Sequence, residues 1–152
     1  MKKIINIAVV GLGQVGIYLL NELNSKKKDI EIKTGKKIKV IAVSARNINK
    51  KRQFKFDKNL FYKNPLDILK KHQVDILFEA IGQSDGVSKK IVEAALKNGT
   101  HVISPNKALI SKHGNTLSQL AEKNNVNLEF EASVAGGIPV LRAIKEGLAT
   151  NK

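Results

Sequence analysis

Short apolar runs alternate along the chain with longer segments in which apolar residues recur every three or four positions. Near-continuous apolar runs are typical of strands buried on both faces, and the longer spacing is typical of helices with one buried face. The runs predict strands at Ile4–Val10, Ile38–Val43, Val74–Ile81, His101–Ile103 and Val126–Phe130. The amphipathic segments predict helices at Gln14–Asn24, Asn64–His72, Gly86–Lys97 and Lys112–Asn124, and a last helix from Pro139 to Leu148. This alternation predicts an α/β fold with a doubly wound parallel sheet.

The connections between these elements have less regular patterns. We expect a polar connection at Lys26–Lys37 and a basic, irregular stretch at Lys50–Lys58. Asp85 precedes a helical pattern and is a candidate N-cap, and Asn98-Gly99 is a candidate end of the same helix. The three histidines are scattered without ligand-like spacing, so we expect structural or solvated roles for them, with His113 in a loop.

The charge of the chain is strongly positive. Its 152 residues carry a formal net charge of +14, but of the 27 basic residues only Arg46, Arg52 and Arg142 are arginine. Recognition of phosphates and bases favours the planar guanidinium of arginine. We therefore expect a solvated lysine surface and no nucleic-acid partner.

Other features of the composition exclude further classes. The chain has no cysteine, which rules out disulfides, thiolate metal sites and a cysteine nucleophile. No apolar run approaches the roughly 18 residues of a membrane span. The first apolar run contains Asn6 and leads into glycines, unlike a signal peptide. The expectation is a cytoplasmic protein with no membrane partner.

A glycine-rich turn joins the first predicted strand to the first helix. Gly11, Gly13 and Gly16 form a G-x-G-x-x-G pattern at this place. The first glycine permits the tight turn, the second lets the backbone approach a pyrophosphate, and the third allows close packing of helix and strand. The helix N-terminus offers free N–H groups to the phosphates. The pattern predicts a Rossmann-type dinucleotide-binding domain; the alternative is a tight turn without a ligand.

The end of the second predicted strand bears on which dinucleotide is bound. An acidic residue there would bind a ribose 2′-hydroxyl, but the sequence has Ser44, Arg46 and Asn47, followed by the basic Lys50–Arg52. A cationic cluster without a carboxylate suits a 2′-phosphate. NADP is therefore preferred and NAD remains possible. The alternative for Lys50–Arg52 is a solvated loop.

Later strand ends carry further candidates. Glu79 is a candidate buried, paired acid, and Ile81 and Gly82 are candidates for lining the nicotinamide side of a cofactor. Lys107 follows the fourth strand, where a lysine can polarise a carbonyl or share a proton with an alcohol; the alternative is a surface lysine. Glu131 is the single charge in the glycine-containing "EASVAGGIP", where carbonyl oxygens and one carboxylate suit a hard cation.

With these stretches in place, the sequence resembles homoserine dehydrogenase over nearly its whole length. The resemblance rests on "GLGQVG", "VSARN", "EAIG", "SPNKALI", "HG" and above all "EASVAGGIPVLRAIKEGLATN". It implies interconversion of L-homoserine and L-aspartate 4-semialdehyde with NAD(P), on the route to threonine, methionine and isoleucine. It also implies a homo-oligomeric full-length enzyme with a dinucleotide-binding domain over residues 1–137. Residues 138–152 would then be a helix leading into a catalytic and dimerisation domain that is missing here.

The resemblance also implies roles for single residues. Gly13, Gln14 and Val15 would hold the pyrophosphate, Arg46 would lie at the adenosine ribose or its phosphate, and Lys107 would lie near nicotinamide and substrate. A monovalent cation, usually sodium in this family, would bind the side chain of Glu131 and the backbone oxygens of Val134, Gly136 and Ile138.

Two departures from the family pattern bear on the cofactor and catalytic segments. Ser104-Pro105 replaces the usual Thr-Ala, and Asn47 stands where Asp is common. Two other readings stay open: a stand-alone NAD(P)-sensing module, and another two-domain semialdehyde or amino-acid dehydrogenase.

Overall fold

A parallel six-stranded sheet forms the centre of the protein. The computed structural model describes residues 4–52 and 56–130. The strands lie in the order β3-β2-β1-β4-β5-β6, and every pair is parallel. Their bounds are β1 (Ile4–Val10), β2 (Lys37–Ser44), β3 (Phe61–Tyr62), β4 (Ile76–Glu79), β5 (His101–Ile103) and β6 (Leu128–Glu129). The predicted doubly wound parallel sheet is confirmed.

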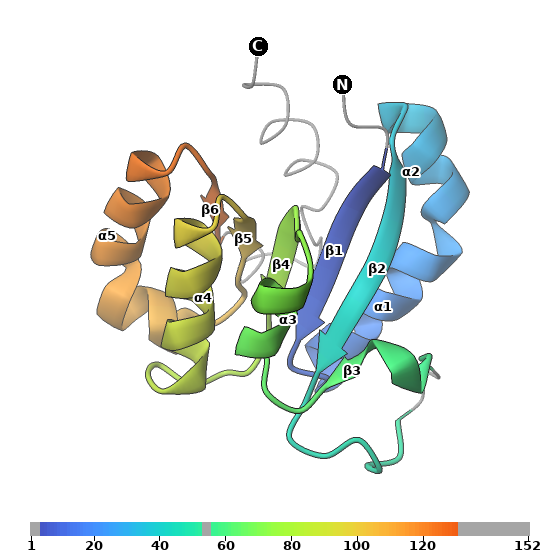
Figure 1. Ribbon diagram of the computed structural model, residues 1–152, viewed down its shortest axis with the longest axis horizontal. Coiled ribbons are helices and arrows are strands. Elements are labelled where there is room, and N and C mark those ends of the chain that lie inside the picture. Colours follow the sequence, from blue (N-terminus) through green and yellow to red (C-terminus); the bar gives the residue numbers. More distant parts are fainter. Residues whose placement is uncertain (1–3, 53–55, 131–152) are drawn as a thin grey trace.

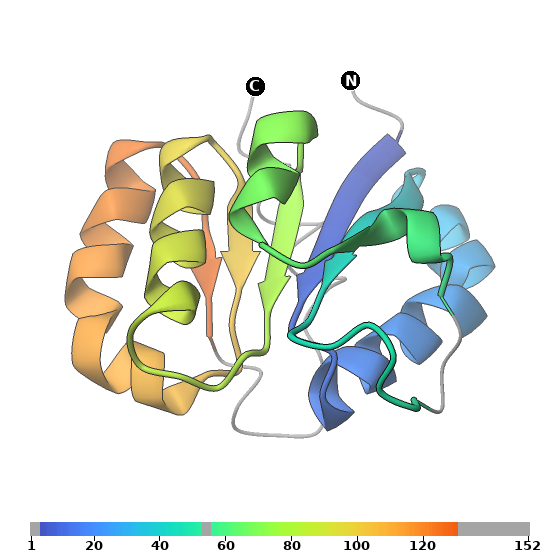
Figure 2. The same ribbon diagram turned by 60° about the horizontal axis from the view of Figure 1, so that its bottom comes forward.

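Helices cover both faces of this sheet (Figure 1). They are α1 (Gln14–Ser25), α2 (Lys27–Thr34), α3 (Leu66–Lys71), α4 (Val87–Lys97) and α5 (Lys107–Lys123), with a short 3₁₀ helix, η1, at Lys58–Leu60. α1 and α2 pack on one face, whereas α3, α4 and α5 pack on the other. All strands end at the lower edge of the sheet in Figure 1, the edge that Figure 2 turns toward the reader.

The core lies in two layers because successive strand residues point to opposite faces. On β1, Ile5, Ile7 and Val9 belong to the cluster under α1 and α2. Ala8 and Val10 belong to the cluster under α3, α4 and α5. The near-continuous apolar run of β1 thus fills both layers, as the sequence pattern predicts.

Three elements were not expected from the sequence, namely α2, β3 and the 3₁₀ helix η1, because their patterns are weak. The polar connection expected at Lys26–Lys37 contains α2, a helix that buries only Ile30 and ends at Gly35 in the left-handed conformation. Its other apolar residue, Ile32, is exposed and the rest are polar, so no hydrophobic periodicity marks the helix. β3 was not expected either, since two residues are too short to show an alternating pattern.

Helix starts also differ from expectation, by two residues for α3 and more for α5. α5 begins at Lys107 rather than Lys112, because the side-chain oxygen of Asn106 accepts a hydrogen bond from the N–H of Leu109 at 3.1 Å. His113 lies in α5, so the expectation of a loop position for it is wrong. Asp85 does not cap α4, whose N-cap residue is Gly86.

Some expectations lie beyond the described residues, including the boundary at residue 137 and the helix from Pro139. Among the described residues, none of the helices has both the length and the apolar character needed to cross a membrane.

Candidate functional site

A cleft of about 1050 Å³ opens at the carboxyl ends of the strands. The chain runs outward from β1 to β2 and β3 on one side and to β4, β5 and β6 on the other, so the strand order reverses between β1 and β4. Ligands of doubly wound sheets bind at this reversal. The cleft is lined by the turn after β1, the segment after β2, the β3–α3 connection and the segment after β4: Val10–Gly13, Ser44–Asn47, Lys50, Arg52, Lys63–Pro65, Asp67, Ala80, Ile81, Gln83 and Val87.

The three glycines of the first turn meet different surroundings. Gly11 has φ +97°, and a Cβ there would overlap the carbonyl group of Ala80. A Cβ on Gly16 would overlap the carbonyl oxygen of Gly11. At Gly13 a Cβ would meet nothing within 4 Å, since this residue faces open space at the cleft. Packing therefore requires Gly11 and Gly16, whereas Gly13 leaves room for a group outside the protein.

The first turn of α1 is suited to an anion. Its N-cap residue Gly13 has no side chain to cap the helix, and the first turn contains no acidic residue. The first N–H groups of a helix have no intrahelical partner and carry a partial positive charge. This first turn includes the exposed residues Gln14 and Val15. The cleft is lined by Gly13 but not by Gln14, Val15 or Gly16, which follow it.

Basic side chains line the part of the cleft beyond β2. Arg46, Lys50 and Lys63 all contribute, and Asp67 is the only acid among the lining residues. Arg46 and Asn47 are exposed at the rim, and Ser44 is buried at the end of β2. The segment after β2 therefore presents cations to the cleft.

Arg52 has a role that the sequence did not reveal. Its guanidinium donates to the carbonyl oxygens of Asn47 at 2.7 Å, Lys50 at 2.9 Å and Leu12 at 3.3 Å. It thus ties the segment after β2 to the glycine turn, rather than extending into solvent. Its partner Leu12 lies 40 residues away, so no local pattern indicates the contact.

The β3–α3 connection was also missed. Lys63, Asn64, Pro65 and Asp67 line the cleft, although the sequence predicted no site role for them. The sequence predicted only that a helix begins at Asn64. β3 pairs with β2 at Ser44↔Tyr62, and this pairing brings the connection to the cleft.

Glu79 lies beneath the opposite side of the cleft, at the end of β4, and does not line the cleft itself. It is fully buried and accepts hydrogen bonds from the Ile81 N–H at 2.8 Å, Ser88 Oγ at 3.0 Å and Ser104 Oγ at 2.7 Å, with Asn106 Nδ2 at 3.4 Å. The expectation of a buried, partnered acid is confirmed. Ile81 lines the cleft, whereas Gly82, with φ +85°, does not.

Lys107 is exposed at the first position of α5. It does not line the main cleft. It lines a separate hollow of about 150 Å³ together with Ser104–Asn106, Ile110 and Phe130. Both hollows lie at the carboxyl edge of the sheet, since they follow β4 and β5.

The histidines have structural partners. His72 shares a 2.7 Å hydrogen bond with the Tyr62 hydroxyl, and His113 contacts Asp85 at 2.8 Å. Burial lowers the pKa of His101, whose Nδ1 accepts from the Asn127 N–H. Within residues 4–52 and 56–130, no three His, Asp or Glu side chains gather as a metal site would require. The expected cation ligands Glu131, Val134, Gly136 and Ile138 lie outside the described residues.

The parallel sheet in this order, the glycine turn at the start of α1 and the cleft at the reversal define a dinucleotide-binding domain of the doubly wound class. The family model "Homoserine dehydrogenase, NAD binding domain" matches residues 11–131. The chain belongs to the homoserine dehydrogenase family.

Curated relatives and solved structures agree with this assignment. Homoserine dehydrogenase of Neisseria gonorrhoeae is 37% identical over 150 residues, which cover 99% of this chain and 34% of the relative. The Bacillus subtilis enzyme is 31% identical over the same length. The crystal structure of S. aureus homoserine dehydrogenase at pH 7.5 aligns with a TM-score of 0.81 and 34% identity, covering 88% of this chain and 34% of that one. The chain thus spans about a third of the length of these relatives.

Proposed function

We propose that this chain is the cofactor-binding part of a homoserine dehydrogenase that interconverts L-homoserine and L-aspartate 4-semialdehyde with NADP(H), on the route to threonine, methionine and isoleucine. The cationic segment after β2, with Arg46 at the rim and no acid, carries the choice of NADP over NAD. A guanidinium suits a 2′-phosphate by charge and geometry, whereas a carboxylate would repel it.

The residues present fit a dinucleotide. Gly11, Gly13 and the first turn of α1, including Gln14 and Val15, would hold the pyrophosphate, and open space at Gly13 gives room for it. Ser44, Arg46 and Asn47 would surround the adenosine ribose, and Ile81 and Gly82 the nicotinamide half. Bound NADP(H) supplies the hydride acceptor or donor.

We assign Lys107 to the substrate side of the site. An ammonium near the reacting oxygen stabilises alkoxide character as the hydride leaves the homoserine carbon, and steadies the aldehyde oxygen in the reverse direction. The lysine contributes this charge from the first position of α5, at the same edge of the sheet as the cleft. The position is compatible with cofactor contact as well.

Further parts of the proposal rest on the sequence resemblance. They are a sodium ion at Glu131, Val134, Gly136 and Ile138, a dinucleotide-binding domain over residues 1–137, and a segment 138–152 leading into a catalytic and dimerisation domain. They also include a cytoplasmic, homo-oligomeric full-length enzyme.

Calorimetry on the 152-residue chain tests the cofactor assignment. NADPH should bind more tightly than NADH. Arg46→Ala should weaken NADPH by roughly 1.5–3 kcal/mol, the range for a charge-assisted hydrogen bond, and leave NADH almost unchanged. Lys123→Ala, at the far end of α5, is the control for a simple loss of positive charge. Equal affinities for the two cofactors, or an equal loss of both in Arg46→Ala, would contradict the proposal.

A further inference from the structure

The carboxylate of Glu79 joins four segments of the chain at the carboxyl edge of the sheet. Its donors come from the β4–α4 loop (Ile81), from α4 (Ser88), from the end of β5 (Ser104) and from the N-cap of α5 (Asn106). The side chain is 0% exposed. All four of these donors are uncharged groups: a backbone N–H, two hydroxyls and a side-chain amide.

A buried carboxylate is costly unless its oxygens are hydrogen-bonded. Here both carboxylate oxygens of Glu79 accept hydrogen bonds, which offsets the cost of removing the group from water. An apolar side chain would not have this cost at all. A gain in stability is therefore a weak reason for a charge at this position. What a carboxylate does provide is strong attachment of several donors at one point, because charge-assisted hydrogen bonds are stronger than neutral ones.

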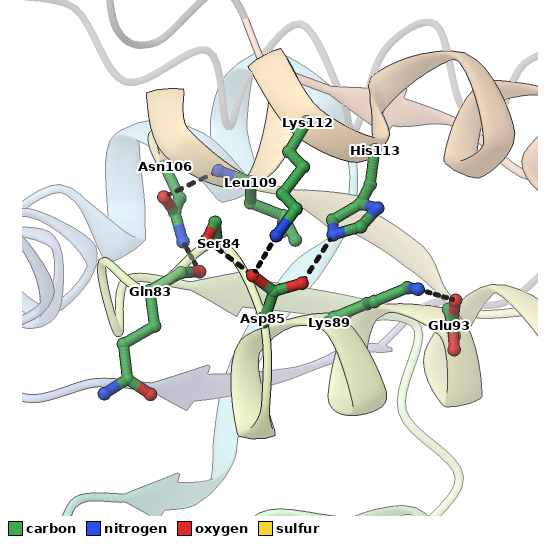
Figure 3. A network of polar contacts seen from close by, with 9 residues as sticks. All are labelled: Gln83, Ser84, Asp85, Lys89, Glu93, Asn106, Leu109, Lys112 and His113. Carbon is green, nitrogen blue, oxygen red and sulfur yellow. Dashed lines mark hydrogen bonds and ion pairs between the residues drawn. The ribbon is translucent and has the colours of Figure 1, made fainter.

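The hydrogen bonds lead from Glu79 to the start of α5. Ser104 Oγ donates to Glu79 at 2.7 Å and accepts from the backbone N–H of Asn106 at 3.2 Å. The Asn106 side chain donates from Nδ2 to the carbonyl of Gln83 at 2.8 Å and accepts at Oδ1 from the N–H of Leu109. Figure 3 shows Asn106 between these two partners. Both the backbone N–H and the amide of Asn106 are therefore fixed, and Lys107 is the next residue.

The same carboxylate also fixes the wall of the cleft. Glu79 Oε1 accepts from the N–H of Ile81, and Ile81 and Gln83 both line the cleft. The position of Lys107 and the position of this wall are thus set by one side chain.

We propose that Glu79 is a positioning residue that aligns Lys107 and the Ile81–Gln83 wall with the nicotinamide half of the bound cofactor. It acts through Ser104, Asn106 and the Ile81 amide. The inference rests on the proposed function, since it assigns the wall to the nicotinamide side of the cofactor cleft.

Glu79→Gln tests the inference because it keeps the shape and removes the charge. Its NH₂ group must face either the Ser104 hydroxyl or the Ile81 N–H, so at least one acceptor is lost. We expect the amides of Ile81 or Leu109 to exchange with solvent about tenfold faster relative to amides at the opposite end of the sheet. Ser104→Ala breaks only the path to Asn106, so Leu109 should lose protection and Ile81 should not. This second variant keeps the inference testable if Glu79→Gln does not fold.

A ligand comparison separates positioning from a general loss of structure. In Glu79→Gln, the Kd for NADPH should rise about tenfold, whereas the Kd for 2′,5′-ADP, which lacks the nicotinamide half, should stay unchanged. Thr100→Val is the matched control. It removes a buried hydroxyl that donates to the Val74 carbonyl at 2.9 Å, before β5 and away from the cleft. Thr100→Val should change neither the ratio of the Kd values for NADPH and 2′,5′-ADP nor the amide exchange at Ile81 and Leu109 relative to other amides.

The outcomes separate this inference from the proposed function. If Glu79→Gln weakens both ligands equally, or changes exchange at Ile81 and Leu109 no more than elsewhere, the inference is overturned. If the unaltered chain binds neither ligand, the proposed function fails, and the nicotinamide assignment fails with it. In that case local loss of protection at Leu109 in Ser104→Ala would still support the path from Glu79 to α5.

Discussion

At the scale of single residues, the three glycines of the turn after β1 are needed for different reasons. Gly11 and Gly16 are required by neighbouring carbonyl groups, whereas Gly13 faces open space. The absence of a Cβ is thus required for packing at Gly11 and Gly16, whereas at Gly13 it leaves space for the proposed ligand. Stability and binding can therefore be separated by substituting the glycines one at a time.

Gly13→Ala and Gly16→Ala form the first matched pair. Gly13 has φ −80°, which alanine adopts freely, so Gly13→Ala should lower the melting temperature only slightly, through the poorer N-cap that alanine makes. It should weaken NADPH binding at least about tenfold, or 1.4 kcal/mol, because the methyl group would occupy space that we propose for the pyrophosphate. Gly16→Ala should lower the free energy of unfolding by about 1–3 kcal/mol through overlap with Gly11. Thermal unfolding measures the stability of each variant, and titration with NADPH measures its affinity. A loss of stability in Gly13→Ala as large as in Gly16→Ala would contradict the separate roles of these glycines.

At the scale of elements, the β4–α4 loop is attached to α5 at its exposed end as well. The Asp85 carboxylate meets Lys112 Nζ at 2.7 Å and His113 Nε2 at 2.8 Å, and Ser84 Oγ donates to it at 2.8 Å (Figure 3). The hydrogen bonds from Lys112, His113 and Ser84 hold the pKa of Asp85 well below its ordinary value of 3.8. The cleft wall is thus attached to α5 at both ends of its loop.

This contact should make stability depend on pH in acid. A carboxyl group whose pKa is lowered by folding stabilises the folded state when ionised. That stabilisation is complete above the ordinary pKa of about 4 and is lost as the pH falls below it. The melting temperature of the unaltered chain should therefore exceed that of Asp85→Asn most clearly at pH 5–7, and the difference should narrow below pH 4. When both proteins also carry Lys112→Met, the difference in melting temperature that Asp85→Asn causes should be smaller. A difference in melting temperature that does not vary with pH would contradict the argument.

At the scale of the whole molecule, binding and turnover should be separable. The cleft and Lys107 lie within the described residues, but no described side chains form an evident site for the amine and carboxylate of homoserine. Hydride transfer requires the substrate carbon and nicotinamide to be held in near-attack geometry. The described residues are therefore equipped for cofactor binding and lack a recognisable means of holding this substrate.

The isolated 152-residue chain should accordingly bind NADPH without oxidising homoserine. The test is the absorbance of NADPH formed from NADP and homoserine by purified chain, with Lys107→Ala prepared in parallel. Turnover that disappears in Lys107→Ala would show that the chain holds both substrate and cofactor and would overturn this expectation. Turnover unchanged in that variant would indicate a contaminating host enzyme.

Local patterns in the sequence determined the class of fold and the centre of the site. Apolar runs marked β1 and β5 with the bounds that the structure gives them, because a buried strand needs apolar side chains along its length. The glycine spacing predicted the turn because its backbone geometry excludes side chains at particular positions. The position of Arg46 at the cleft was predictable because a residue that closely follows a strand end must lie at the edge of the sheet.

Only the tertiary structure decided what depends on contacts between distant segments. β3 exists through its pairing with β2, and that pairing brings Lys63 and Asp67 to the cleft. Arg52 joins two segments of the site only because Leu12 lies beside it in space. Glu79 was recognisable as a possible buried acid, but its path to α5 required Ser104 and Asn106 to meet it. Sequence patterns record which residues are buried and which backbone shapes are needed, whereas the partner of a polar side chain depends on how the elements pack.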